Sequence, residues 1–230
     1  MIEAIAIDID GTLTHRDRSI DCRAVACLRT LKIPIVLATG NVLCFARAAA
    51  KLIGTGGQII AENGGVISLE YDGEEYYDGD IKACERAFNA LNAHFNVEKI
   101  DPNYRKTEIA LRRNFDSADA ERIVGREIEV VDSGYAIHLK SGSVDKGTGL
   151  RRIADLMGID AGDFAAIGDS RNDIQMFAAA GFSIAVGNAH PSLMEVSDLT
   201  TFGKYGAGVV EAIEYLVQNS MITGMEIHKK

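Results

Sequence analysis

The sequence contains no uninterrupted run of 18 apolar residues, so it predicts no membrane-spanning helix. Its N-terminus leads directly into strand-like sequence and has no basic region followed by a long apolar stretch, which predicts a chain without a signal peptide. The four cysteines, Cys22, Cys27, Cys44 and Cys84, show no CxxC or Cys/His metal spacing. We therefore expect reduced, buried thiols in a cytoplasmic protein rather than a disulfide framework.

Positive charge is also scarce, because 24 Lys and Arg stand against 33 Asp and Glu, which gives a net charge of −9 at pH 7. Such a surface repels nucleic acid and anionic membranes on average, which argues against both as partners. A small phosphorylated metabolite is an anion too, so binding one requires a local patch of positive charge or a metal ion. The apolar share of 47% is typical of a protein with a packed core, and we expect a monomer or a small homo-oligomer.

Short apolar runs alternate with amphipathic helical segments in the first and last parts of the chain. The predicted strands cover residues 4–9, 35–38, 58–61, 164–167, 182–186 and 199–201. Helical patterns separate them, and a final helix is predicted over residues 209–217. Strands and helices that alternate in this way predict an α/β fold with a Rossmann-like parallel sheet that helices cover on both faces.

The pattern changes between these two parts. Residues 66–69 and 75–77 predict a hairpin, and a helix with Asp80 as its N-cap follows. A strand at 108–112, a short helix at 117–124 and a hairpin at 127–140 then predict a separate antiparallel sheet. We therefore expect a core of residues 1–80 and 145–230, interrupted by a small α+β cap domain of residues 81–144.

Polar clusters follow three of the predicted strands, and a fourth opens the helix where the parallel pattern resumes. They are Asp8-Ile9-Asp10-Gly11-Thr12, Thr39-Gly40-Asn41, Gly168-Asp169-Ser170-Arg171-Asn172-Asp173 and Asp145-Lys146-Gly147. Because ligands of such sheets bind beyond the carboxyl ends of the strands, we expect these clusters to form one site.

The acids in these clusters predict a metal site. Asp8 and Asp10 are two residues apart, so on extended backbone both carboxylates would point to one side. Two such charges are unfavourable unless they share a cation or a proton, and Asp169 and Asp173 add two more acids. Acids without clustered His or Cys favour a hard cation, and Mg²⁺ fits when phosphate is present. The alternative is that each Asp caps a turn or a helix; for Asp173 alone the two interpretations are equally good.

The same clusters contain residues suited to an anion. Thr39 and Lys146 would supply a hydroxyl and a positive charge to phosphate oxygens. Taken singly, Thr-Gly or Lys-Gly is equally typical of an ordinary helix start. Glycines that would let backbone N–H groups approach an anion accompany each cluster: Gly11, Gly40, Gly147 and Gly168.

The motifs resemble those of a known superfamily. Asp8-Ile9-Asp10-Gly11-Thr12 matches the DxDGT nucleophile motif of the haloacid dehalogenase (HAD) superfamily, and the other three clusters resemble its later motifs in the right order. Glu62-Asn63-Gly64-Gly65 resembles a turn of its Cof-type members, which carry a C2-type cap between the second and third motifs. The short cap and the overall length look most like the archaeal phosphoglycolate phosphatases of that group.

This resemblance implies a HAD fold and Mg²⁺-dependent hydrolysis of 2-phosphoglycolate through an aspartyl-phosphate. Asp8 would attack phosphorus, and Asp10 would serve as general acid and then as general base. Mg²⁺ would be held by the Asp8 carboxylate, the Asp10 backbone carbonyl and Asp169, with Asp173 binding directly or through water. Thr39, Gly40 and Lys146 would bind the transferred phosphoryl group.

One position departs from the family pattern, and it concerns substrate choice. Asn41 stands where many Cof-type relatives have Arg, so a substrate contact made by that Arg is missing. Cations in the predicted cap are candidates to bind the carboxylate of a phospho-acid, or else are solvated surface charges: Arg105, Lys106, Arg112 and Arg113. His138 alternates with apolar neighbours, which favours a packed or surface residue over a ligand.

Three other functions are compatible with parts of this pattern. The first is hydrolysis of another small phosphomonoester, such as a sugar phosphate. A phosphosugar mutase would use the same pair of acids but needs a larger cap than residues 81–144 provide. A regulatory phosphoacceptor domain would need only Asp8 and predicts no second acid two residues later, where this chain has Asp10.

Overall fold

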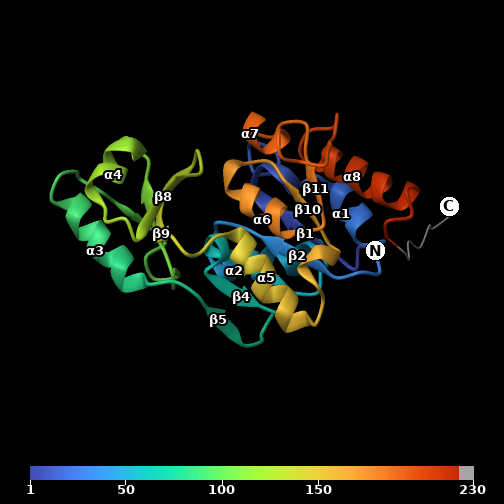
Figure 1. The fold of residues 1–230 in the computed structure, drawn as a ribbon, viewed down its shortest axis with the longest axis horizontal. Coiled ribbons are helices and arrows are strands. Elements are labelled where there is room, and N and C mark those ends of the chain that lie inside the picture. The colour runs from blue at the N-terminus through green and yellow to red at the C-terminus, as the bar shows by residue number, and fades with distance from the viewer. Residues whose placement is uncertain (223–230) are drawn as a thin grey trace.

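The computed structural model describes residues 1–222, and they form two β-sheets with helices packed against each (Figure 1). The larger sheet has the order β12-β11-β10-β1-β2-β3-β4-β5. Its strands are β1 (Ala4–Asp8), β2 (Ile35–Ala38), β3 (Ile59–Ala61), β4 (Val66–Ser68), β5 (Glu75–Tyr77), β10 (Phe164–Gly168), β11 (Phe182–Ala185) and β12 (Leu199–Thr200). The strands from β12 to β3 are parallel to one another, and the hairpin of β4 and β5 adds two antiparallel strands.

Helices cover both faces of this sheet, as the sequence predicted. In β1 the side chains alternate, so Ile5 and Ile7 pack on one face and Ala4 and Ala6 on the other. The first face is covered by α1 (Cys22–Leu28), α2 (Leu43–Ile53) and α8 (Gly206–Gln218). The second is covered by α5 (Lys146–Met157), α6 (Ile174–Ala179) and α7 (Pro191–Met194). The α/β fold class is therefore confirmed.

The smaller sheet is antiparallel and has the order β6-β7-β9-β8. It contains β6 (Lys99–Ile100), β7 (Ile109–Arg112), β8 (Ile128–Asp132) and β9 (Ala136–Ser141), and α3 (Ile81–Asn92) and α4 (Ser117–Ile123) pack against it. In Figure 1 these elements form a lobe beside the larger sheet. The predicted domain boundaries at residues 81 and 144 stay a prediction, although the chain leaves the larger sheet after β5 and returns to its surface in α5.

The faces of the smaller sheet follow from the two-residue repeat of its strands. Ile137 and Leu139 of β9 pack with the helices, as Ile109 of β7 does. Their neighbour His138 therefore lies on the opposite face, where it pairs in register with Ala110 of β7. This second face is turned toward the carboxyl ends of the parallel strands, where the candidate site lies.

The cysteines differ from the expectation in one respect. All four are free thiols within helices, but only Cys84 is buried; Cys22 and Cys44 are exposed on α1 and α2. Within residues 1–222, none of the helices combines the length and the apolar character needed to cross a membrane.

Candidate active site

The predicted site residues come from the carboxyl ends of three neighbouring strands. Asp8 is the last residue of β1, Thr39 follows β2, and Asp169 follows β10. Parallel pairing aligns Asp8 with Ala38 and Ile7 with Ile167, so these three ends lie at the same edge. Lys146 joins them from the first turn of α5, which the Asp145 side chain caps.

Lys146 lies between two carboxylates in the interior of this site. Its Nζ atom is 2.6 Å from Asp8 Oδ1 and 2.6 Å from Asp173 Oδ1, and all three side chains are buried. Burial alone would lower the pKa of Lys146, but the charges of Asp173 and Asp8 raise it overall, so the amine is held as a cation. Burial raises the pKa of Asp8 well above its usual range, although Lys146 opposes that rise.

Three of the four predicted metal ligands lie together. One carboxylate oxygen each of Asp8, Asp169 and Asp173 lies within 4.8 Å of the others. Burial, followed by the charge of Asp173, raises the pKa of Asp169 to about 7. Asp8 Oδ2 is buried and has no hydrogen-bond partner in the described part of the chain. An unpaired buried carboxylate oxygen beside two further acids is a donor set that suits a hard cation.

Asp173 also supports the loop around it. Its Oδ2 accepts hydrogen bonds from the backbone N–H groups of Asp169 (3.1 Å) and Ser170 (3.0 Å), while Oδ1 accepts from Lys146. Both carboxylate oxygens are thus engaged by the protein itself. The capping interpretation therefore holds for this residue.

Asp10 lies outside the cluster of three acids. The strand ends at Asp8, and Ile9–Leu13 form a tight turn. Asp8 (φ −68°, ψ 152°) and Asp10 (φ −82°, ψ 108°) both have extended backbone, but the Asp10 carboxylate does not join the acidic cluster. The Asp10 carboxylate accepts a hydrogen bond from Asn41 Nδ2 at 2.9 Å and lies 4.0 Å from Arg18 Nε. Asn41 therefore orients the predicted general acid.

The glycines of the motifs permit close packing between segments of the site. Gly11 has φ +93°, and a Cβ atom there would lie 2.3 Å from Asp169 Oδ2. A Cβ atom on Gly168 would lie 2.7 Å from Asp173 Cγ. These two positions need glycine because a side chain would push the acids apart, which is a different reason from the backbone contact to an anion that the sequence suggested.

The predicted phosphate-binding residues are close together but differ in exposure. Thr39 is buried, and its hydroxyl accepts a hydrogen bond from the N–H of Asn41 at 3.0 Å. Gly40 lies beside it and lines a cavity that also contains Asp8, Asp10 and Asp169. The structure therefore brings the residues of all four motifs to one edge of the larger sheet.

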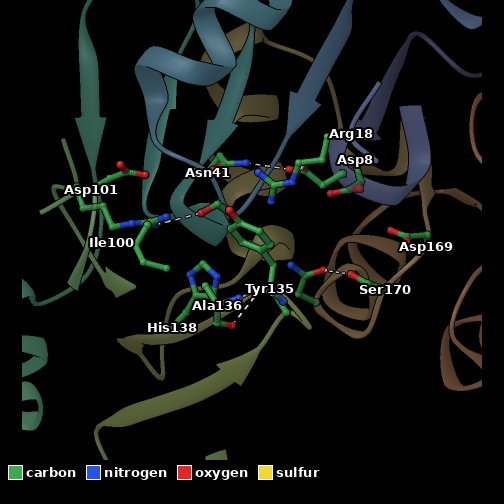
Figure 2. A pocket seen from close by; sticks show the side chains of 15 residues that line it. Asp8, Arg18, Asn41, Ile100, Asp101, Tyr135, Ala136, His138, Asp169 and Ser170 are labelled. Atoms are coloured by element: carbon green, nitrogen blue, oxygen red, sulfur yellow. Dashed lines mark hydrogen bonds and ion pairs between the residues drawn. The ribbon is translucent and has the colours of Figure 1, made fainter. Parts of the chain in front are cut away.

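A cavity of about 170 Å³ lies between this edge and the smaller sheet. Figure 2 shows Tyr135, Ala136 and His138, from β9 and the turn before it, across from Asp8 and Asn41. The sequence had placed His138 among packed or surface residues, and it is a buried residue that lines the cavity. No local feature of the sequence pointed to Arg18, whose guanidinium lies 3.7 Å from the ring centroid of Tyr135.

Comparison with known proteins identifies the family. Residues 5–108 and 94–213 match the family described as haloacid dehalogenase-like hydrolase. The chain belongs to this family. The resemblance seen in the motifs is thereby confirmed, and the chain is a hydrolase by family.

Several curated archaeal proteins are similar to this haloacid dehalogenase-like hydrolase over nearly their whole length. A phosphoglycolate phosphatase of Methanosarcina mazei is 51% identical over 223 residues, which is 96% of this chain and 99% of that protein. A phosphoglycolate phosphatase of Archaeoglobus fulgidus is 52% identical over 215 residues, covering 93% and 96% of the two chains.

Solved structures share the fold. The crystal structure of Thermoplasma acidophilum protein 0175 has a TM-score of 0.84 at 24% identity and covers 96% of this chain and 100% of its own. A haloacid dehalogenase-like hydrolase from Bacteroides thetaiotaomicron has a TM-score of 0.76 at 21% identity, with 94% and 100% covered.

A buried polar network joins the two sheets in this haloacid dehalogenase-like hydrolase. Asn172 Nδ2 donates to Asn63 Oδ1 at 3.0 Å, and Asn63 Nδ2 donates to Glu108 Oε2 at 2.8 Å. Glu108 Oε1 lies 2.7 Å from His138 Nδ1. Burial would raise the pKa of Glu108, but the charge of His138 and the hydrogen bonds around it lower the pKa overall. The fourth motif is thus connected to the cavity face of β7 and β9.

Glu62, which follows β3, holds the segment before β7 from the side of the larger sheet. Its carboxylate accepts hydrogen bonds from the backbone N–H groups of Lys106 (3.0 Å) and Thr107 (2.8 Å) and from the Thr107 hydroxyl (2.9 Å). Burial, followed by the charge of Glu108, raises the pKa of Glu62. The Glu62-Asn63 pair, noted in the sequence only as a family turn, therefore positions the segment that leads into β7.

Proposed function

We propose that this chain hydrolyses 2-phosphoglycolate to glycolate and phosphate, with Asp8 as the nucleophile. The main support is the location of Asp8. It lies beside Lys146 and two further acids at the edge of a cavity of only about 170 Å³. Ligand sites more often measure about 300–1,000 Å³, so this cavity favours a very small phosphomonoester over a sugar phosphate. The names of the archaeal relatives support the same substrate.

The residues of the chain divide the reaction between them. Asp8 attacks phosphorus and forms an aspartyl-phosphate as the bond to the glycolate oxygen breaks. Asp10, held by Asn41, gives its proton to the leaving oxygen; it then accepts a proton from the water that hydrolyses the aspartyl-phosphate. Lys146 stabilises the negative charge on the phosphoryl group together with Thr39 and Gly40. Residues 1–80 and 145–230 serve as the catalytic core, and residues 81–144 serve as the cap that covers it.

We further propose that Mg²⁺ occupies the acidic cluster. The unpaired Oδ2 of buried Asp8 and the nearby carboxylates of Asp169 and Asp173 fit this ion. When bound, Mg²⁺ supplies positive charge that offsets the acids and the phosphoryl oxygens. Asp8, the backbone carbonyl of Asp10 and Asp169 would hold it directly. Asp173, whose two oxygens already accept hydrogen bonds, would hold it through water.

A panel of phosphorylated metabolites, assayed with Mg²⁺ and with EDTA, tests the function. We expect the highest kcat/KM for 2-phosphoglycolate, and we expect EDTA to remove turnover until Mg²⁺ is restored. A higher kcat/KM for a hexose phosphate would instead favour the sugar phosphatase. Stable phosphorylation of the protein without release of phosphate would favour a regulatory phosphoacceptor.

Asp10→Asn is expected to slow turnover of 2-phosphoglycolate by about 10²- to 10⁴-fold, because both proton transfers lose their group. The loss should be much smaller for the first step with p-nitrophenyl phosphate, whose leaving group needs no proton. Pre-steady-state release of p-nitrophenol measures that step separately. An unchanged kcat with 2-phosphoglycolate would show that another group donates the proton.

A further inference from the structure

Arg105 brings a cation into the cavity from the segment before β7. Its side chain is only 5% exposed and lines the cavity together with Asp8 and Asp10. The other cap cations differ: Lys106 is exposed, Arg112 is 63% exposed and pairs with Glu98, and Arg113 pairs with Asp132. Of the four cap cations that the sequence offered as candidates, Arg105 alone is buried at the site.

The guanidinium of Arg105 is held by one of its nitrogens. Nη1 donates to the carboxylate of Glu108 and to the backbone oxygen of Gly40, the latter at 3.1 Å. Nε is buried and has no hydrogen-bond partner among residues 1–222. A buried N–H group without an acceptor is unfavourable, because it has given up its hydrogen bond to water. The hydrogen bonds of the side chain involve Nη1 alone, so the edge formed by Nε and Nη2 has no acceptor within residues 1–222.

That edge has the geometry that carboxylates prefer. Arginine presents two parallel N–H groups that match the two oxygens of a carboxylate. The cavity also contains the carboxylates of Asp8, Asp10, Asp101 and Asp169, but within residues 1–222 none of them accepts a hydrogen bond from Arg105. A carboxylate from a ligand would complete the hydrogen bonding of Arg105.

The position of Arg105 also bears on the length of the substrate. Its contact to the oxygen of Gly40 places the guanidinium directly against the loop that follows β2, where Thr39 and Gly40 are proposed to bind the phosphoryl group. Glu108 accepts a hydrogen bond from the same Nη1 nitrogen and is itself held by Asn63 and His138. A carboxylate on Arg105 would therefore lie near a phosphoryl group on that loop, an arrangement that suits a short substrate.

We infer that Arg105 binds the carboxylate of the substrate through its Nε and Nη2 edge, and that it thereby sets a preference for short phosphorylated carboxylic acids. The inference rests on the proposed function and assigns a residue to the choice of substrate. Glu108 and His138 act as positioning residues for Arg105.

The test compares two substrates of similar length, 2-phosphoglycolate and 2-hydroxyethyl phosphate, which has a neutral hydroxyl in place of the carboxylate. In Arg105→Met we expect kcat/KM for 2-phosphoglycolate to fall about 10- to 100-fold, because a charged hydrogen-bonded pair is lost. For 2-hydroxyethyl phosphate it should change by less than about 3-fold. Arg105→Lys keeps the charge without the planar fork and should lose an intermediate amount with 2-phosphoglycolate alone.

Arg112→Met is the matched control, because it removes an arginine of the same cap that lies on the surface and pairs with Glu98. It should leave kcat/KM for both substrates unchanged. Circular dichroism reports whether each variant is folded, and Arg105→Lys carries the same comparison if Arg105→Met does not fold.

Two results would overturn the inference and leave the proposed function standing. One is an equal loss for both substrates in a folded Arg105 variant, which would make Arg105 a purely structural residue. The other is a full preference for 2-phosphoglycolate in that variant, which would assign the carboxylate to another group such as Arg18. A wild-type enzyme that hydrolyses other phosphomonoesters but not 2-phosphoglycolate would overturn the proposed function, and this inference with it.

Discussion

Asp8→Asn should lower kcat by about four orders of magnitude or more while the protein stays folded, because an amide oxygen cannot form the aspartyl-phosphate. The substitution keeps the shape of the side chain, and its amide oxygen can still accept a hydrogen bond from Lys146. The buried Asp8 carboxyl, whose pKa is raised by burial, is replaced by a neutral group, so we expect no loss of stability.

The decisive measurement is acid quenching after brief exposure to a substrate with a radiolabelled phosphoryl group. With labelled p-nitrophenyl phosphate, whose leaving group needs no proton, Asp10→Asn should retain label on the protein, because its aspartyl-phosphate forms but hydrolyses slowly. Asp8→Asn should retain none. Asp155→Asn, which changes an exposed acid on α5, is the control and should behave as wild type. Substantial turnover by a folded Asp8→Asn protein would contradict a covalent mechanism through this residue.

Much of the fold could be predicted because local patterns determine it. The alternation of apolar runs and amphipathic helices predicted the parallel sheet, and β1 shows why: Ile5 and Ile7 face one helical layer, and Ala4 and Ala6 the other. The site could be located because the carboxyl ends of parallel strands share one edge, which Asp8 and Asp169 both reach. Both inferences need only the order of elements along the chain.

Contacts between distant segments could not be predicted in the same way. The two-residue repeat of β9 shows that His138 faces away from Ile137 and Leu139, but it does not show what lies opposite. The partner is Glu108 of a neighbouring segment, and Asn63 of the turn between β3 and β4 completes the contact. The turn that carries Asp10 away from the acidic cluster also escaped prediction, because it depends on how Gly11 packs against Asp169.

Lys146→Met should lower kcat by about 10²- to 10³-fold, since a fixed positive charge at the phosphoryl group is lost. It should also destabilise the protein by about 3–5 kcal/mol, because it leaves the buried carboxylates of Asp8 and Asp173 without their cation. Unfolding by urea in the presence of EDTA measures this difference without a contribution from bound metal.

The loss of stability in Lys146→Met should depend on pH with a defined sign. Burial already raises the pKa of Asp8, and removing Lys146 removes the interaction that opposes this rise. A carboxyl whose pKa is raised on folding contributes stability that is present below its unfolded pKa and is lost as the pH rises through its folded pKa. The variant should therefore be more destabilised relative to wild type at about pH 8 than at about pH 5.

Lys140→Met is the control, because it also removes a buried lysine. Its carboxylate partner Glu129 is 50% exposed and remains solvated, so the destabilisation of Lys140→Met should not shrink toward low pH. A pH-independent loss of stability in Lys146→Met would mean that the charge of the lysine does not stabilise the two carboxylates. The electrostatic account of the site would then be wrong.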